Sequence, residues 1–125
     1  HKRRRIVWLE KQTRSDTLTS FRESDAFVLS SKLETQPIAI LEAMSLGKPW
    51  IAREAGCINR MDGGICVRSV PGMASAMRAL ASNSELRIRL GAKGRLAVES
   101  NYNYERYGHS YRTLMKELVT LRMAK

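Results

Sequence analysis

The chain has 125 residues, of which 43% are hydrophobic and 27% are charged, which is the size and composition of one globular domain. No stretch approaches the roughly 20 consecutive apolar residues of a membrane-spanning helix, and no signal-peptide pattern opens the chain, so we expect a cytoplasmic protein. Its two cysteines, Cys57 and Cys66, lack the paired spacing of a zinc motif. We therefore expect no metal site and reduced, buried thiols, with a disulfide as the alternative.

The net charge of +10 suits a partner that carries negative charge, such as nucleic acid, an anionic membrane or a phosphorylated substrate. Its densest part is the run HKRRR at residues 1–5, which we interpret as a solvated basic tail. The other basic residues are scattered over predicted helices, without a recognition motif or interleaved aromatic residues, which argues against nucleic acid. A basic module that binds nucleic acid or an anionic surface is nevertheless one alternative function.

The first part of the chain predicts two strands separated by a short helix. Residues 5–10 (RIVWLE) and 25–31 (DAFVLSS) are short apolar runs with β-branched and aromatic residues, which is typical of buried strands. Between them, Ser15 or Asp16 is a suitable N-cap for a helix that carries Leu18 on its apolar face.

The centre of the chain predicts a helix at 37–46 and strands at 48–53 and 64–69. Gly47 fits the left-handed residue that stops a helix, and Pro49 prevents its continuation. Strands that alternate with helices imply crossover connections and a parallel sheet. The predicted fold class is therefore α/β: a partial Rossmann-like, three-layer domain with a short, mostly parallel sheet flanked by helices.

Three helices are expected in the C-terminal part. Two apolar stripes at helical spacing predict the first pair, and a longer stripe predicts the last helix, with Asn103 as its N-cap. We expect the methionine and tyrosine stripes to be buried core rather than ligand contacts. The stripe residues are Met73, Met77 and Leu80, then Leu86, Leu90 and Ala97, then Tyr104, Tyr107, Tyr111, Leu114, Leu118 and Leu121.

The turn into the helix at 37–46 has the composition of an anion site. This helix directly follows a strand, so the backbone N–H groups of Gln36, Ile38 and Ala39 would face outward at the positive end of the helix dipole. Such a helix start suits a diphosphate. Glu34 lies in the loop just before it, and Glu42 is the one charged residue within the helix.

Glu42 needs a partner, because a buried carboxylate costs several kcal/mol unless it is paired or hydrogen-bonded. The two hydroxyls of a sugar diol could supply the hydrogen bonds. An ion pair with Lys48 or with a nearby arginine is an alternative, and so is a side chain that simply reaches solvent. The spacing leaves these three interpretations open.

The segment SDAFVLSSKLETQPIAILEAMSLGKPWIA resembles the donor-binding half of the GT-B glycosyltransferases, specifically group 1, also called family 4. That family reads aspartate, an apolar strand and Pro-Ser, then two glutamates separated by seven residues, then Ala-Met-Ala, Gly and Pro. The later AGCINRMDGGICV looks like its glycine loop and next strand. The matching residues are Asp25, Ser31, Glu34, Glu42, Ala43, Met44, Gly47 and Pro49.

This resemblance implies retaining transfer of a sugar from a nucleotide-sugar donor, without a required metal or other cofactor. Glu34 would bind hydroxyls of the donor sugar and is the candidate catalytic residue, while Glu42 would hold the ribose diol. Electrostatic stabilisation of the departing diphosphate would supply much of the catalysis. The other implied donor-binding positions are Gln36, Pro37 and Ile38 for phosphate and sugar, and Glu10 for the nucleobase.

The sequence departs from the family pattern in three ways. Ser30 replaces the usual proline, and Thr35 with Gln36 replaces a common Gly-Phe pair, which makes the phosphate loop less permissive. Arg60 stands where many relatives have a glutamate, which reverses a charge near the donor site. A domain that has lost its chemistry and serves assembly, or a nucleotide-sugar epimerase of the same architecture, are therefore further alternatives.

Residues 1–125 would form a single partial domain, because the resemblance starts at what looks like the family's third donor-domain strand. The N-terminal acceptor domain would be missing, and we expect no activity from this chain alone. Residues 25–31, 48–53 and 64–69 would form contiguous strands, whereas 5–10 would dock beside 25–30 or pair with another chain. The unpaired strand thus allows a homo-oligomer. Peripheral contact with the inner face of a membrane is a further expected interaction, in line with the basic net charge.

Overall fold

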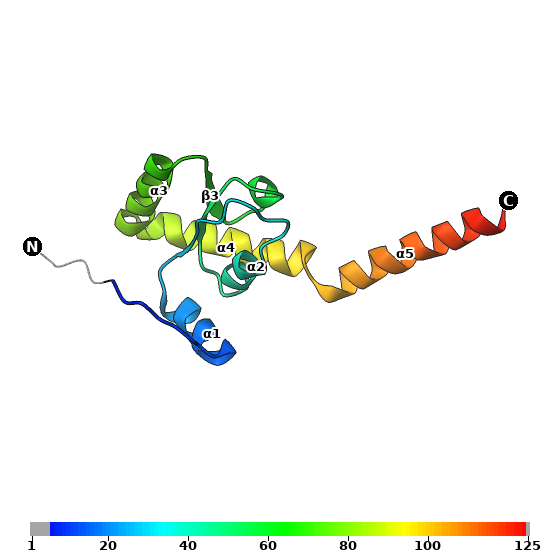
Figure 1. The fold of residues 1–125 in the computed structure, drawn as a ribbon, viewed down its shortest axis with the longest axis horizontal. Helices are drawn as coiled ribbons and strands as arrows, with labels where there is room; N and C mark the ends of the chain where they lie inside the picture. Colours follow the sequence, from blue (N-terminus) through cyan, green and yellow to red (C-terminus); the bar gives the residue numbers. More distant parts are fainter. Residues whose placement is uncertain (1–5, 125) are drawn as a thin grey trace, which may run out of the picture.

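The structure is a computed structural model that describes residues 6–124 and centres on a three-stranded parallel sheet (Figure 1). Each strand lies within a predicted one, and the spatial order β1-β2-β3 confirms that the strands are neighbours in chain order. The predicted α/β class, with a parallel sheet flanked by helices, is confirmed. The strands are β1 (Phe27–Leu29), β2 (Trp50–Arg53) and β3 (Gly64–Val67).

Helices cover both faces of the sheet because its central strand, β2, is apolar on both sides. Trp50 and Ala52 pack against α2 (Ile38–Ser45) and α4 (Ser84–Asn101), while Ile51 packs on the other face. That second face is covered by α3 (Val70–Ser82) through Ala76 and Leu80. Burial of a side chain the size of Ile51 is worth about 1.5–3 kcal/mol, so β2 is the best-anchored part of the sheet.

The end of α2 is fixed by a contact between two glycines. Gly47 has φ +66°, the left-handed conformation that was predicted to stop this helix. Gly91 of α4 lies directly on it, since a Cβ atom at Gly91 would come within 2.0 Å of the Gly47 carbonyl oxygen. The missing side chain therefore lets α4 pack close against the turn from α2 into β2.

The N-terminal apolar segment is not a strand, which corrects the prediction for residues 5–10. Residues 6–10 have no strand pairing, and the side chains of Ile6 and Trp8 are 90% and 81% exposed. The segment therefore does not dock beside β1, because an apolar run becomes a strand only where a neighbouring ladder accepts its backbone groups. Pairing with a second copy stays a prediction, and the basic tail at 1–5 lies outside the described residues.

The first helix, α1 (Arg14–Glu23), begins one residue before the predicted cap positions. Its N-cap is Thr13, whose hydroxyl oxygen accepts from the Asp16 amide at 3.2 Å. The Asp16 carboxylate in turn accepts from the Thr13 hydroxyl at 2.7 Å and from the Thr13 amide at 3.2 Å, and these two bonds lower the pKa of its carboxyl. The two residues form a capping box, and this reciprocal pairing explains why Ser15 and Asp16 are not themselves the cap.

The last helix, α5 (Tyr104–Met123), extends away from the sheet and ends near the C terminus (Figure 1). Asn103 is its N-cap as predicted, with its side-chain oxygen accepting from the Arg106 amide at 2.8 Å. The prediction of a buried tyrosine stripe is wrong, because Tyr104 is 97% and Tyr107 63% exposed. Within residues 6–124 no other element covers this face of α5. Among the helices that the structure describes, none is long and apolar enough to cross a membrane.

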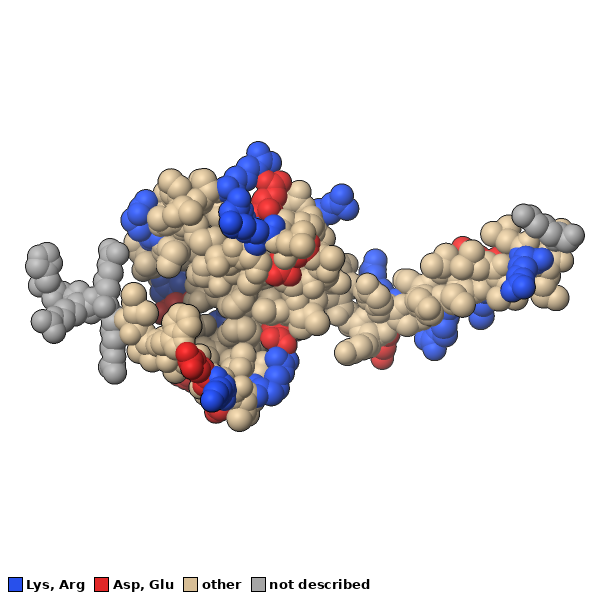
Figure 2. Space-filling model, in the orientation of Figure 1, with Lys and Arg blue, Asp and Glu red and all other residues tan. Residues whose placement is uncertain are grey.

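Charged side chains are mixed on the visible face of the molecule. Figure 2 shows lysines and arginines spread over the body and α5, with acidic residues among them. Among the described residues, exposed charges also pair with each other: Lys93 contacts Asp62 at 2.8 Å, and Arg95 contacts Glu99 at 3.0 Å. Figure 2 therefore shows no continuous basic stripe on this face.

Removal of α5 should leave the folded body intact. No residue of this helix is buried, so a chain that ends at Asn103 should keep its melting temperature within about 3 °C, while its helical circular dichroism falls. Thermal unfolding of the two chains compares them directly. Loss of the cooperative transition would show that α5 does contribute to the core.

Candidate functional site

The predicted turn joins the carboxyl end of β1 to α2. Its loop holds Glu34 and Gln36 partly buried, and Pro37, which is buried, forms the N-cap rather than the first residue of the helix. The amides of Ile40 and Leu41 donate to the Pro37 carbonyl at 3.1 and 3.4 Å. Pro37 therefore closes the first turn through its carbonyl, since it has no N–H to donate.

Two backbone N–H groups are free at the start of α2. Among the hydrogen bonds of the described residues, none uses the amides of Ile38 or Ala39, and no side chain caps this end. The side chain of Ile38 is 68% exposed, so this helix start lies at the surface. Free amides at the positive end of a helix dipole can hold an anion.

A glycine in the next loop fixes the position of the Glu34 backbone. Gly56 follows β2 with φ +52°, and a Cβ atom there would come within 2.0 Å of the Glu34 carbonyl oxygen. Beside it, the Cys57 amide donates to the Thr35 carbonyl at 3.4 Å. The loops after β1 and β2 thus support each other at the carboxyl edge of the sheet, where ligands of open α/β sheets bind.

Glu42 lies in the second turn of α2 and forms an ion pair with Arg14, the first residue of α1. The contact joins a guanidinium nitrogen to Oε1 of Glu42, whose side chain is 17% exposed, whereas that of Arg14 is 65% exposed. The hydrogen bond to Glu42 raises the pKa of Arg14. Of the alternatives for Glu42, the structure therefore contains the pair with a nearby arginine, and not the pair with Lys48.

Glu10 is exposed just before α1. Its carboxylate accepts from the Trp8 indole N–H at 2.6 Å, and its backbone carbonyl accepts from Gln12 at 3.0 Å. The loop from Glu10 to Thr13 runs directly into Arg14, which contacts Glu42. The ion pair thus brings the start of α1, and the predicted nucleobase position before it, towards α2.

A further carboxylate at this edge of the sheet is that of Glu54, which directly follows β2. Arg68 donates to Glu54 through two nitrogens, with the Nη2–Oε1 distance at 3.2 Å, and this bond lowers the pKa of Glu54. The Glu54 amide also donates to the Val67 carbonyl at 2.8 Å. Glu54 is therefore already occupied in joining the ends of β2 and β3.

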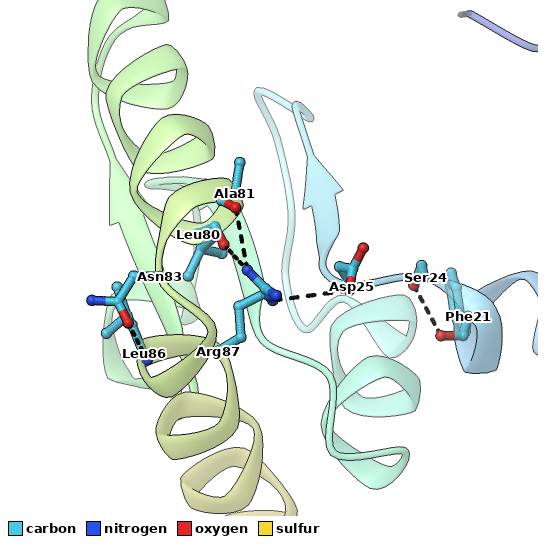
Figure 3. A network of polar contacts seen from close by, with 8 residues as sticks. All are labelled: Phe21, Ser24, Asp25, Leu80, Ala81, Asn83, Leu86 and Arg87. Carbon is cyan, nitrogen blue, oxygen red and sulfur yellow. Dashed lines mark hydrogen bonds and ion pairs between the residues drawn. The ribbon is translucent and has the colours of Figure 1, made fainter.

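The aspartate at the start of the motif, Asp25, lies away from the candidate site. Arg87 donates to the carbonyls of Leu80 and Ala81 at 2.5 and 3.4 Å, at the end of α3 (Figure 3). The same guanidinium lies 3.9 Å from Asp25, which precedes β1 and hence lies at the opposite edge of the sheet from Glu34. The Asp25 side chain is 89% exposed, so this contact adds little stability, and its position at that edge places Asp25 outside the candidate site.

The start of α2 lies at the surface, where Ile38 is exposed. A hollow of about 350 Å³ lies elsewhere, between β1 and α3, lined by Val28, Ile51 and Met77 among others. Within residues 6–124, no three His, Cys, Asp or Glu side chains are grouped to hold a metal ion. The absence of a metal requirement stays a prediction.

Sequence reasoning missed two residues of this site. Gly56 was recognised as part of a glycine loop, but its contact with the backbone of Glu34 was not predicted. The glycine itself was the one signal that a close backbone approach was needed there. Arg14 carried no signal, because an ion pair between two helices depends on where they lie in space and not on their spacing in the chain. Arg60 is exposed in the short 3-10 helix at Ile58–Arg60.

The three-stranded parallel sheet flanked by helices is similar to a GT-B glycosyltransferase domain. The family model described as glycosyl transferases group 1 matches residues 1–83, and the chain belongs to this family.

Two similar proteins support this assignment. A protein of Xenopus tropicalis, glycosyltransferase 1 domain-containing protein 1, is 31% identical over 117 residues, which cover 90% of this chain and 34% of that protein. The solved sucrose-phosphate synthase from Thermosynechococcus elongatus matches with a TM-score of 0.66 and 24% identity, over 75% of this chain and 26% of that one. This second likeness shows the fold, and the chain spans only about a third of the length of the first protein.

Replacement of Gly56 by alanine should loosen the turn that holds Glu34. The new Cβ would overlap the Glu34 carbonyl, so we expect a loss of about 1–3 kcal/mol in unfolding free energy and faster amide exchange in residues 33–38. Hydrogen exchange with mass spectrometry measures the local effect.

The matched control for this variant is Gly108→Ala in α5. There the nearest heavy atom to the new Cβ is the end of the Arg112 side chain at 3.8 Å, so the change should be neutral or stabilising by up to about 1 kcal/mol. Unchanged exchange at residues 33–38 in Gly56→Ala would refute the supporting role of the glycine loop.

Proposed function

We propose that this chain carries part of the donor site of a retaining glycosyltransferase, which transfers a sugar from a nucleotide-sugar to an acceptor. The observation that carries the proposal is the start of α2, where the free amides of Ile38 and Ala39 are flanked by Glu34 and Glu42. Membership of the glycosyl transferases group 1 family supports the reaction class.

Each end of the donor has a partner in this arrangement. The amides beyond Gln36 and Pro37 receive the diphosphate, whose charge grows as the bond to the sugar breaks, and the helix dipole stabilises that charge. Glu34, held by the glycine loop, accepts hydrogen bonds from the donor sugar and is the candidate catalytic residue. Glu42 accepts from the ribose hydroxyls, and the Glu10 loop lies towards the base.

The acceptor site and full activity belong to the rest of a longer protein in this proposal. The chain covers 34% of its relative in Xenopus tropicalis, so an acceptor domain would fit in the remaining length of such a protein. We expect this chain alone to bind a donor without turning it over. A cytoplasmic location is part of the proposal, because Cys57 and Cys66 are free thiols, as proteins of a reducing compartment have.

Nucleoside diphosphate binding should depend on Glu42. Titration calorimetry with a panel of nucleoside diphosphates, in buffer without divalent metal, should show binding of a nucleoside diphosphate with one particular base. Glu42→Gln should lower the affinity for that nucleotide about tenfold or more, because a charged hydrogen-bond acceptor is lost. Glu34→Gln should leave the affinity for the nucleoside diphosphate unchanged and lower the affinity for the corresponding nucleotide-sugar.

The control for charge is Glu99→Gln, which removes an exposed carboxylate paired with Arg95 on α4. It should bind like the unmodified chain. Equal affinities for Glu42→Gln and Glu99→Gln, or no binding of any nucleotide by the unmodified chain, would contradict the proposed donor site.

A further inference from the structure

Arg14 occupies a defined place beside the proposed ribose acceptor. It is the first residue of α1, and the capping box of Thr13 and Asp16 fixes the backbone at that point. Its guanidinium contacts one oxygen of Glu42, Oε1, through one nitrogen. Because an ionised carboxylate can accept about four hydrogen bonds, this contact leaves Oε2 and part of Oε1 available.

Stability alone does not explain why Arg14 holds this position, although the pair gives the mostly covered Glu42 carboxylate a charged partner. Its side chain is 65% exposed, and ion pairs with an exposed partner contribute little, typically about 0–1 kcal/mol. The effect on Glu42 is more specific, since a glutamate side chain has several rotatable bonds and its carboxylate would otherwise sample many orientations. A diol needs both acceptor oxygens at fixed positions, because two hydroxyl donors must be met at once.

We propose that Arg14 is a positioning residue for ribose recognition, which orients the Glu42 carboxylate so that it accepts from both hydroxyls of the donor's ribose. The inference rests on the proposed function and deepens it, because it assigns the discrimination between ribose and 2′-deoxyribose to a contact between α1 and α2. Arg14 acts through Glu42 and takes no part in the sugar transfer itself.

The positive charge of Arg14 could also attract a diphosphate, and that effect can be separated from positioning. Electrostatic attraction acts equally on ribo and 2′-deoxyribo nucleotides of one base, so it changes both affinities by the same factor. Orientation of Glu42 acts on the 2′-hydroxyl and therefore changes the ratio of the two affinities. A purely structural role of Arg14 would leave that ratio unchanged.

The test compares the affinity of a nucleoside diphosphate with that of its 2′-deoxy analogue by titration calorimetry. The unmodified chain should prefer the ribo form about tenfold, the usual worth of one hydrogen bond to a charged group. Arg14→Gln should reduce this preference to about threefold or less, and Arg14→Lys should restore part of it. The double variant Arg14→Gln/Glu42→Gln should show no further loss beyond Glu42→Gln.

Arg22→Gln is the matched control, because Arg22 is exposed in the last turn of the same helix and its loss changes the net charge equally. It should keep the tenfold preference. An unchanged ribo preference in Arg14→Gln, or tighter ribo binding by that variant, would overturn the positioning role. If the unmodified chain binds no nucleoside diphosphate, the proposed function fails and this inference falls with it, whereas binding with an unaffected ratio contradicts the inference alone.

Discussion

The candidate site depends on one close contact, that of Gly56 with the backbone carbonyl of Glu34. No side chain fits between these two loops, because even a Cβ atom would lie 2.0 Å from the carbonyl oxygen. The loop that carries Gly56 follows β2, which is buried on both faces through Trp50 and Ile51. The most firmly anchored strand thus transmits its position to the loop before α2, and through it to Glu34.

The apolar composition of α2 and its internal glutamate have compatible explanations. Ile40, Ala43 and Met44 are fully buried against the sheet and α4, so one side of the helix has to be apolar. Glu42 lies between these residues in sequence but keeps 17% of its side chain exposed and contacts Arg14. No charged residue is buried in the described part of the chain, and the partly buried Glu42 has Arg14 as its partner.

Local sequence signals predicted the parts of the fold that local physics controls. The three strands, the helix before Gly47 and the cap at Asn103 were found because apolar runs, a left-handed glycine and a side-chain acceptor act within a few residues. The segment at 6–10 and the tyrosine stripe of α5 were misjudged for the opposite reason. An apolar pattern shows that a face can be buried, but not what lies against it, and nothing in residues 6–124 covers either one.

The site itself was partly predictable. Glu34, Glu42 and the start of α2 were identified from their spacing and their resemblance to a family, whereas the ion pair between Arg14 and Glu42 joins two helices whose positions in space the sequence does not reveal. The central claim is that a nucleotide binds at this turn, and two-dimensional ¹H–¹⁵N NMR with a nucleoside diphosphate tests it most directly. The account predicts that the amides of Ile38, Ala39 and Glu42 shift on titration, while those of α5 do not. Shifts confined to α5, or none at all, would contradict it.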